Sequence, residues 1–328
     1  MKFTASVLVA LCFSSALTFL PAGATHATDV TAVSLTVSNL DSAIRFYTEV
    51  LEFKLDRQGE VAGDPYETLY GVFGARIAFA RMRLGTETLE LLQFLVPAGR
   101  PVPADSRAND RAFQHVAIIV SDMARAYARL REHHVRYASS EPQRLPAWNP
   151  NAGGIEAFYF RDPDGHYLEL LHFPPDKGAA QWHQASSRLF LGIDHTAIVV
   201  DDTAKSIAFY AALGLKVAGH SENYGTEQEH LNNVFGAHLL ITALRGEHGP
   251  GVELLEYLAP RDGRPLPADT RSNDLWHWHV VMSHVWDSNP EVPAHHHKFV
   301  VLPDPGLGLS NATMVSDPDG HALILARH

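Results

Sequence analysis

The stretch HTAIVVDDTAKSIAFYAALGLKV, His195 to Val217, sets out one unit of local structure. Its mostly β-branched start predicts a strand, the Asp-Asp-Thr after it predicts a helix N-cap, and an amphipathic helix follows. The same order recurs in HVAIIVSDMARAYARLREHHVRY from His115 and in AVSLTVSNLDSAIRFYTEVLEFKL from Ala32. A fourth copy starts at His279, where two prolines weaken the helix. Short strands separated by Gly and Pro turns follow each helix, which gives four βαβββ modules.

The chain also repeats at a longer period. PADSRANDRAFQHVAI, Pro103 to Ile118, aligns without gaps with PADTRSNDLWHWHVVM, Pro267 to Met282. We therefore predict two tandem halves of two modules each. The predicted boundaries are a signal segment over 1–27, a first domain over 28–175, a linker over 176–188 and a second domain over 189–328.

Composition limits the class of protein. A chain of 328 residues that is 46% hydrophobic can bury a sizeable core and form two domains. The formal charge is −11, and no basic patch stands out, so we expect no nucleic-acid partner.

The N-terminal segment has the pattern of a secretory signal. Lys2 precedes an apolar run that ends in small residues, and the run is shorter than the ~20 residues of a membrane anchor, the alternative interpretation. Cys12, the only cysteine of the chain, lies in this segment. We expect a secreted or periplasmic protein with no membrane span after signal removal, in which nitrogen and oxygen would hold any metal ion.

Three motifs recur at equivalent places. They are the H-x-A-I-x-V-x-D openings at His115 and His195, the pairs Phe46-Tyr47 and Phe209-Tyr210, and the D-P-D-G-H turns at 162–166 and 317–321. On these motifs the chain resembles the vicinal oxygen chelate superfamily, which includes glyoxalase I, methylmalonyl-CoA epimerase, extradiol dioxygenases, fosfomycin resistance proteins and bleomycin-binding proteins. The resemblance implies an α+β, glyoxalase-like fold in which the four modules form two cupped mixed β-sheets, each around a metal and substrate site.

In such modules one residue of the opening strand and one of the closing strand face the metal. The opening positions hold Ala32, His115, His195 and His279, and the closing positions hold Glu90, Glu169, Glu253 and Ile324. Strand alternation puts Glu253 and Glu256 on opposite faces, and the repeat selects Glu253 because Glu90 matches it. The alternative interpretation is that these are ordinary polar groups at a sheet rim.

Module pairing decides which site exists. Pairing of modules two and three gives one cup with His115, Glu169, His195 and Glu253, and leaves the other with Ala32, Glu90, His279 and Ile324. Pairing within each half leaves both cups one ligand short, with His195, Glu253 and His279 as the better triad. The first arrangement resembles tandem glyoxalase I proteins and puts both losses in one cup, so we favour it; the second remains open.

Two imidazoles and two carboxylates around one divalent ion (Zn, Ni, Mn or Fe(II)) leave room for vicinal oxygens of a small-molecule substrate. By the resemblance, Glu169 is the base of an exported glyoxalase-like isomerase or lyase. The alternatives are an extradiol dioxygenase, whose signature residues 159–169 match only in part, and a non-catalytic binding protein of the bleomycin-resistance type. We expect loops 143–154 and 223–237 to line the cup mouth, and the protein to be a monomer.

Overall fold

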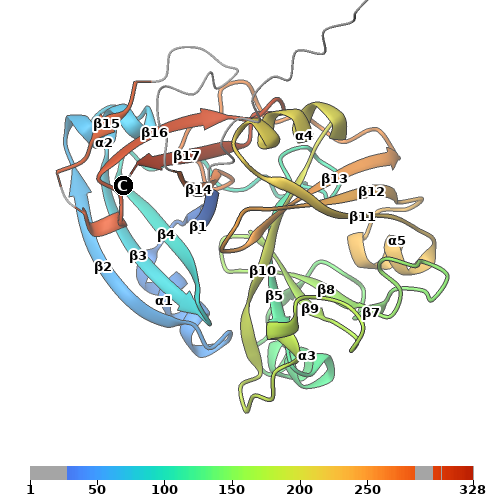
Figure 1. The fold of residues 1–328 in the computed structure, drawn as a ribbon. Coiled ribbons are helices and arrows are strands. Elements are labelled where there is room, and N and C mark those ends of the chain that lie inside the picture. Colours follow the sequence, from blue (N-terminus) through green and yellow to red (C-terminus); the bar gives the residue numbers. More distant parts are fainter. Residues whose placement is uncertain (1–27, 285–297, 304, 328) are drawn as a thin grey trace, which may run out of the picture.

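The computed structural model describes residues 28–284, 298–303 and 305–327. The predicted signal segment, Cys12 and the proline-weakened part of the fourth module lie outside the described residues. The described residues form two curved mixed sheets that lie beside each other, as Figure 1 shows. This is the predicted α+β architecture.

The first sheet combines the first and fourth modules. Its strand order is β15-β16-β17-β14-β1-β4-β3-β2, and β1 runs antiparallel to β14 at the junction of the modules. Its strands are β1 (Thr28–Thr36), β2 (Lys54–Ala62), β3 (Arg76–Leu84), β4 (Glu87–Val96), β14 (Trp278–His284), β15 (Val300–Val301), β16 (Asn311–Ser316) and β17 (Ala322–Arg327).

The second sheet combines the second and third modules. Its order is β11-β12-β13-β10-β5-β9-β8-β6, with β7 beside β8 and with β5 antiparallel to β10 at the junction. Its strands are β5 (Gln114–Val120), β6 (Arg136–Tyr137), β7 (Gln143–Arg144), β8 (Glu156–Arg161), β9 (Tyr167–His172), β10 (Phe190–Val199), β11 (Lys216–Tyr224), β12 (His238–Arg245) and β13 (Gly251–Ala259). The favoured pairing of modules is therefore confirmed.

The three predicted N-caps are confirmed. The side chains of Asn39, Asp122 and Asp202 each accept a hydrogen bond from the backbone N–H three residues later, which satisfies a donor that the first helical turn leaves free. The helices are α1 (Leu40–Glu49), α2 (Asp64–Tyr70), α3 (Met123–Glu132), α4 (Thr203–Ala212) and α5 (Thr226–Asn232), with short 3₁₀ turns η1 (Ala180–His183) and η2 (Pro305–Leu307). Among the described residues, no helix has the length and apolar character needed to cross a bilayer.

Four apolar clusters fill the part of the molecule that the structure describes. Two of them line the concave faces of the sheets, one in each cup. The other two lie between the sheets, where α1 and α3 pack in one cluster and α4 packs in the other. Each sequence half therefore packs through its helices, while the sheets join modules from different halves.

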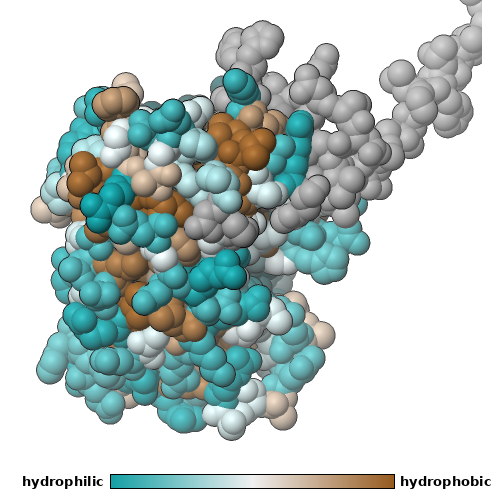
Figure 2. All heavy atoms as spheres, turned by 90° about the vertical axis from the view of Figure 1, so that its left-hand side faces the viewer, coloured by the Kyte–Doolittle hydropathy of each residue, from teal (hydrophilic) through white to brown (hydrophobic). Residues whose placement is uncertain are grey.

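The outer strand of the first sheet is charged. β2 is almost wholly exposed and carries Lys54, Arg57 and Glu60. Charged side chains on an edge strand oppose pairing with another chain. Figure 2, which views the side of the molecule on the left in Figure 1, shows patches of hydrophobic residues separated by hydrophilic ones.

The two D-P-D-G-H turns are structural. Asp162 is buried, accepts hydrogen bonds from the backbone N–H groups of residues 164–166, and bonds to the hydroxyl of Tyr47 at 3.2 Å. Asp317 bonds in the same way to Tyr210 at 3.3 Å. Because these tyrosines belong to the Phe-Tyr pairs on α1 and α4, each turn fixes one module of a half to the other. The chain can therefore keep the turn where it has lost a carboxylate on the next strand.

Each turn also holds a buried ion pair. His166 Nδ1 lies 2.7 Å from Asp162, and His321 Nδ1 lies 3.0 Å from Asp317. Burial alone disfavours the charged imidazole, but the adjacent carboxylate outweighs it and raises the pKa of each histidine; the paired aspartates have a lowered pKa. Each ion pair therefore stabilises the fold at pH values between the lowered pKa of its aspartate and the raised pKa of its histidine.

This arrangement predicts a pH-dependent effect of His166→Gln. A raised histidine pKa contributes stability that is complete below the unfolded value of about 6.5 and is lost as pH rises through the folded pKa. The variant should therefore lose more unfolding free energy at a pH of about 5.5 than at a pH of about 9.5. Urea unfolding at both pH values checks this; equal losses would contradict the ion pair.

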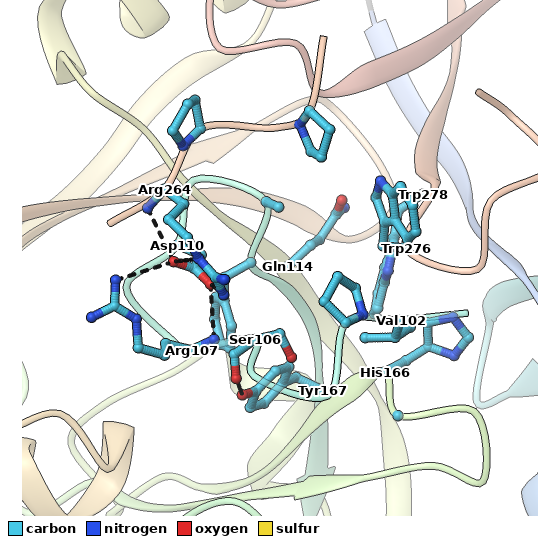
Figure 3. Close-up of a pocket in the computed structure, with 16 residues that line it drawn as sticks. Val102, Ser106, Arg107, Asp110, Gln114, His166, Tyr167, Arg264, Trp276 and Trp278 are labelled. Carbon is cyan, nitrogen blue, oxygen red and sulfur yellow. Dashed lines mark hydrogen bonds and ion pairs between the residues drawn. The ribbon is translucent and has the colours of Figure 1, made fainter. Parts of the chain in front are cut away.

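Ion pairs between the two loops that follow β4 and β13 and the opposite half join the halves, and we call these contacts the clasp. Arg264 reaches across to Asp110 with an N–O distance of 2.6 Å, and Arg100 makes the equivalent contact with Asp274 at 2.7 Å. Figure 3 shows Asp110 held between Arg264 and Arg107. Asp110 and Asp274 occupy equivalent places in the two repeated stretches that revealed the duplication.

A cavity of about 150 Å³ lies beside this clasp. Phe113, Tyr167, Trp276 and Trp278 line it, and its wall is mainly apolar (Figure 3). The ring of Phe113 also packs against the ring of His115, with 5.5 Å between the ring centroids. Phe113 therefore lies between this cavity and the concave face of the second sheet.

Candidate metal centre

Four of the predicted ligands stand on four adjacent strands. Glu253 lies on β13, His195 on β10, His115 on β5 and Glu169 on β9, in that order across the second sheet. The register places Ala117 beside both His195 and Glu169, and Ala197 beside both His115 and Glu253. Because the two alanines are small and fully buried, they leave the space between the longer side chains free.

Three of these residues converge closely. Single ligand atoms of His115, Glu169 and His195 all lie within 4.8 Å of one another. Glu169 Oε2 is 3.2 Å from His115 Nε2 and 3.7 Å from His195 Nε2. All three residues are buried, so the carboxylate faces both imidazoles away from bulk water.

Glu253 completes the set from the side of the cleft. Its Oε2 lies 3.3 Å from His195 Nε2. Its side chain is 21% exposed, against 6% for Glu169. The structure therefore brings the four predicted residues together, with Glu253 in the most open position.

The imidazole nitrogens in this cluster fit a metal ion. Nε2 of both His115 and His195 is buried and has no hydrogen-bond partner, although carboxylate oxygens lie nearby. Buried polar atoms normally have a partner, and nitrogen atoms that face carboxylates without hydrogen bonding to them are suited to share a cation. Two imidazoles and two carboxylates are a ligand set for Zn²⁺, Ni²⁺, Mn²⁺ or Fe²⁺.

The carboxylates dominate the local electrostatics. Burial lowers the pKa of His195, but Glu253, Asp194 and Glu169 outweigh it and raise that pKa to about 9. Burial raises the pKa of Glu253, and the charge of His195 offsets this only in part. The cluster thus has an excess of negative charge that a proton or a divalent cation would neutralise.

The strand pattern also explains why Glu256 is not part of the site. Glu256 points to the other face of β13, where its carboxylate accepts the backbone N–H of Thr203 at the start of α4. Gln93, its equivalent in the first half, accepts the N–H of Leu40 at the start of α1. The prediction that Glu253, and not Glu256, faces the cup is therefore confirmed.

The cup of the first sheet has a different interior. Ala32 and Ile324 belong to its apolar cluster, and Val281 stands where the second sheet has Ala117. Glu90 accepts a hydrogen bond from Ser34 at 2.6 Å. This carboxylate also lies 3.5 Å from Arg81, and burial raises its pKa.

His279 stands on β14 of this first sheet. Burial and the neighbouring His277 lower its pKa. The alternative triad of His195, Glu253 and His279 is therefore not brought together, because His279 lies in the other sheet.

A cleft of about 1350 Å³ opens from the cluster. Glu169, His195 and Glu253 lie in its wall, as do parts of both loops predicted at the mouth, with Asn151 from loop 143–154 and Asn223 from loop 223–237. The two segments are linked, because Asn149 Nδ2 donates to Asn223 Oδ1 at 2.8 Å. The predicted placement of both segments at the cleft is confirmed, but the prediction of a loop over 223–237 is wrong, because that segment contains the helix α5.

Part of the cleft wall is a chain of buried amides. Asn149 donates to Asn223, Asn223 to Gln228, Gln228 to Asn232, and Asn232 to the hydroxyl of Tyr257. Asn223 and Gln228 line the cleft, and each amide has more donors and acceptors than the chain uses. This wall can recognise hydroxyl and carbonyl oxygens.

Sequence reasoning missed three residues behind the site. Asp194 contacts His195 Nδ1 at 2.9 Å, and Trp182 and Arg245 donate to Asp194. Asp194 directly precedes His195, which was a visible signal, but strand alternation would place it on the opposite face.

Comparison with known proteins agrees with this architecture. The family model for the Glyoxalase/Bleomycin resistance protein/Dioxygenase superfamily matches residues 26–170 and 192–325. A 2-epi-5-epi-valiolone epimerase from Actinomyces sp. is 33% identical over 163 residues, which cover 48% of this chain and 85% of that protein. An uncharacterized protein of Bacillus subtilis is 27% identical over 136 residues, 41% of this chain and 90% of that one.

Solved structures share the fold over nearly the whole chain. Glyoxalase I from Zea mays superposes with a TM-score of 0.57 at 18% identity, over 92% of this chain and 93% of that one. A putative dioxygenase from Bacillus subtilis gives a TM-score of 0.56 at 14% identity, over 92% and 85%. The family match extends over both halves, and the chain therefore belongs to the Glyoxalase/Bleomycin resistance protein/Dioxygenase superfamily.

Proposed function

We propose that the protein is a metal-dependent enzyme that moves a proton at a carbon next to a carbonyl group of a small oxygenated substrate, an isomerase, epimerase or lyase type of reaction. The observation that carries this proposal is the convergence of His115, Glu169, His195 and Glu253 with the Nε2 atoms of both histidines unpaired. A divalent ion held by these residues would act as a Lewis acid on the substrate carbonyl.

The two carboxylates differ in position, which suggests different roles. Glu169 lies close to both imidazoles and is the deeper ligand. Glu253 approaches only His195 and reaches into the cleft, so it has more freedom to take a proton from a substrate carbon and return it. We therefore propose Glu253 as the base, beside the sequence-based prediction that gives this role to Glu169.

The cleft favours an uncharged substrate. Among its lining residues carboxylates outnumber guanidinium groups, and two of the three arginines, Arg81 and Arg245, already pair with Glu90 and Asp194. Phosphates or additional carboxylates would find few free cations there. The amide wall suits hydroxyl groups, and the name of the related epimerase points to a polyhydroxylated ketone. We propose neutral hydroxy-ketones as the substrate class.

The test combines metal content with hydrogen exchange. The mature protein, prepared without a histidine tag, should bind about one equivalent of Zn²⁺, Ni²⁺, Mn²⁺ or Fe²⁺. The loaded protein should exchange the C–H hydrogen next to the carbonyl of a neutral hydroxy-ketone in D₂O, followed by NMR. Binding below about a tenth of an equivalent would contradict the proposal and favour a metal-free binding protein. Oxygen consumption on catechols would favour the extradiol alternative.

We further propose that the enzyme acts as an exported monomer. The support is the signal pattern over residues 1–27 and the internal duplication, which brings two modules to each sheet within one chain. Gel filtration and N-terminal sequencing of the protein recovered from the periplasm or medium test this.

A further inference from the structure

Asp194 breaks the regular pattern of β10. The pairing of β10 with β5 shifts between Ile193 and His195, which leaves Asp194 as an extra residue in the strand. Successive side chains of a regular strand point to opposite faces, but a bulge can re-aim one of them. As a result, Asp194 Oδ2 lies 2.9 Å from Nδ1 of the next residue, His195.

The Asp194 carboxylate is fixed by three donors. It is 4% exposed. Trp182 Nε1 donates to its Oδ1 at 2.9 Å, while Arg245 Nη2 and His195 Nδ1 approach its Oδ2 at 2.5 Å and 2.9 Å. Arg245 Nη1 also donates to the backbone oxygen of Asp194 at 2.7 Å. The carboxylate therefore cannot turn without losing one of these bonds.

One donor comes from the segment that joins the halves. Trp182 lies in η1, within the predicted linker. Its ring packs against Gly192, where an added Cβ would lie 2.8 Å from ring atoms and 2.5 Å from Glu87. Only glycine leaves room for this approach. The linker is thus seated directly behind the metal-facing strand.

The first sheet supplies a natural comparison. Its β1 has the same irregularity, between Val30 and Ala32, so Thr31 occupies the place of Asp194. Thr31 donates to the backbone oxygen of Val281 at 3.3 Å. The bulge is therefore common to both cups; the aspartate occurs where the next residue is His195, and the threonine where the next residue is Ala32.

We infer that Asp194 is a positioning residue that keeps the proton of His195 on Nδ1, so that the lone pair of Nε2 faces the ion, and that Trp182 and Arg245 hold it in place. This inference rests on the proposed function. A carboxylate on the far nitrogen of a ligand histidine fixes the ring and strengthens it as a ligand. Through Trp182, the linker then contributes to metal affinity in addition to joining the two halves.

The test is Asp194→Asn in the full mature protein. If the amide oxygen faces Trp182, the NH₂ group faces His195 and Arg245; if the oxygen faces His195, the NH₂ group faces the indole N–H of Trp182. In both orientations His195 loses the negative charge of its acceptor, and at least one donor around residue 194 is left unsatisfied. We expect affinity for Zn²⁺, measured by competition with a chromophoric chelator, to fall by about 10- to 100-fold. The visible spectrum of bound Co²⁺ should change as well. Trp182→Phe, which keeps the ring packing, should weaken affinity by a smaller factor.

Matched controls separate positioning from stability. Asp274→Asn removes a comparable buried partner of an arginine, Arg100, outside the cup, and Trp276→Phe removes an indole hydrogen bond there. Both should keep wild-type Zn²⁺ affinity and the Co²⁺ spectrum even where melting temperature falls. A folded Asp194→Asn variant with wild-type affinity and spectrum would overturn the inference and leave the proposed function intact. Should the Asp194→Asn variant fail to fold, wild-type Zn²⁺ affinity in Trp182→Phe would overturn the inference. A wild-type protein that binds no ion would overturn both.

Discussion

Replacement of His195 by alanine is expected to weaken binding of a divalent ion by more than about 100-fold. His195 Nε2 lies within 3.7 Å of both carboxylates, so its loss leaves them with one imidazole and a gap. Zinc sites of four ligands bind with about 10–16 kcal/mol, so one ligand accounts for roughly 3 kcal/mol, which exceeds a factor of 100. Isothermal titration of the metal-free protein measures the change.

The same substitution at His279 is the matched control. His279 is the first-sheet counterpart of His115, is at least as deeply buried as His195 (1% against 7% exposed), and has no carboxylate ligand on the neighbouring β17, where Ile324 stands. His279→Ala should therefore leave metal affinity unchanged. Wild-type affinity in His195→Ala, or a comparable loss in His279→Ala, would contradict the assignment of the metal centre to the second sheet.

The paired variants Glu253→Gln and Glu169→Gln should separate proton transfer from metal binding. Glutamine keeps the shape but cannot take a proton, and loss of a general base typically costs about 10²–10⁴ in rate. Glu253→Gln should lose hydrogen exchange by that factor while it retains most of its metal affinity. Glu169→Gln should lose more metal affinity than Glu253→Gln, because the Glu169 carboxylate faces both imidazoles.

The reverse result would return the base role to Glu169. Exchange rates are compared at saturating metal, so that an affinity defect is not read as a catalytic one. If Glu169→Gln binds metal as tightly as the wild type but exchanges no hydrogen, the sequence-based prediction is correct and the proposal for Glu253 is wrong. If both variants retain full exchange, neither carboxylate is the base.

Local patterns predicted the opening strands and the helices α1, α3 and α4, but not the short helices α2 and α5. Caps such as Asn39 and Asp202 are read directly from sequence, because a capping side chain bonds to a backbone N–H only three residues away. Internal repetition identified the modules, and the opposite directions of Glu253 and Glu256 followed from strand alternation. Module pairing was inferred from the completeness of one ligand set, and the strand order confirms it.

Long-range contacts that no repeated pattern marks in the sequence could not be predicted. The position of Asp194 follows from a bulge, and a bulge is defined by the partner strand rather than by the residue itself. Trp182 stood in a segment whose composition indicated only a linker. Arg81, which lies beside Glu90 in the first cup, occupies a place that is alanine in the other half, Ala243, so the repeat gave no signal there.

Anomalous diffraction from crystals of the protein grown with Zn²⁺ or Ni²⁺ tests the central claim most directly. The account predicts one strong peak within bonding distance, about 2.0–2.2 Å, of Nε2 of His115 and His195 and of an oxygen of Glu169, with Glu253 at the same ion. A peak in the first sheet near His279, or a loaded crystal with no peak between these four residues, would contradict it.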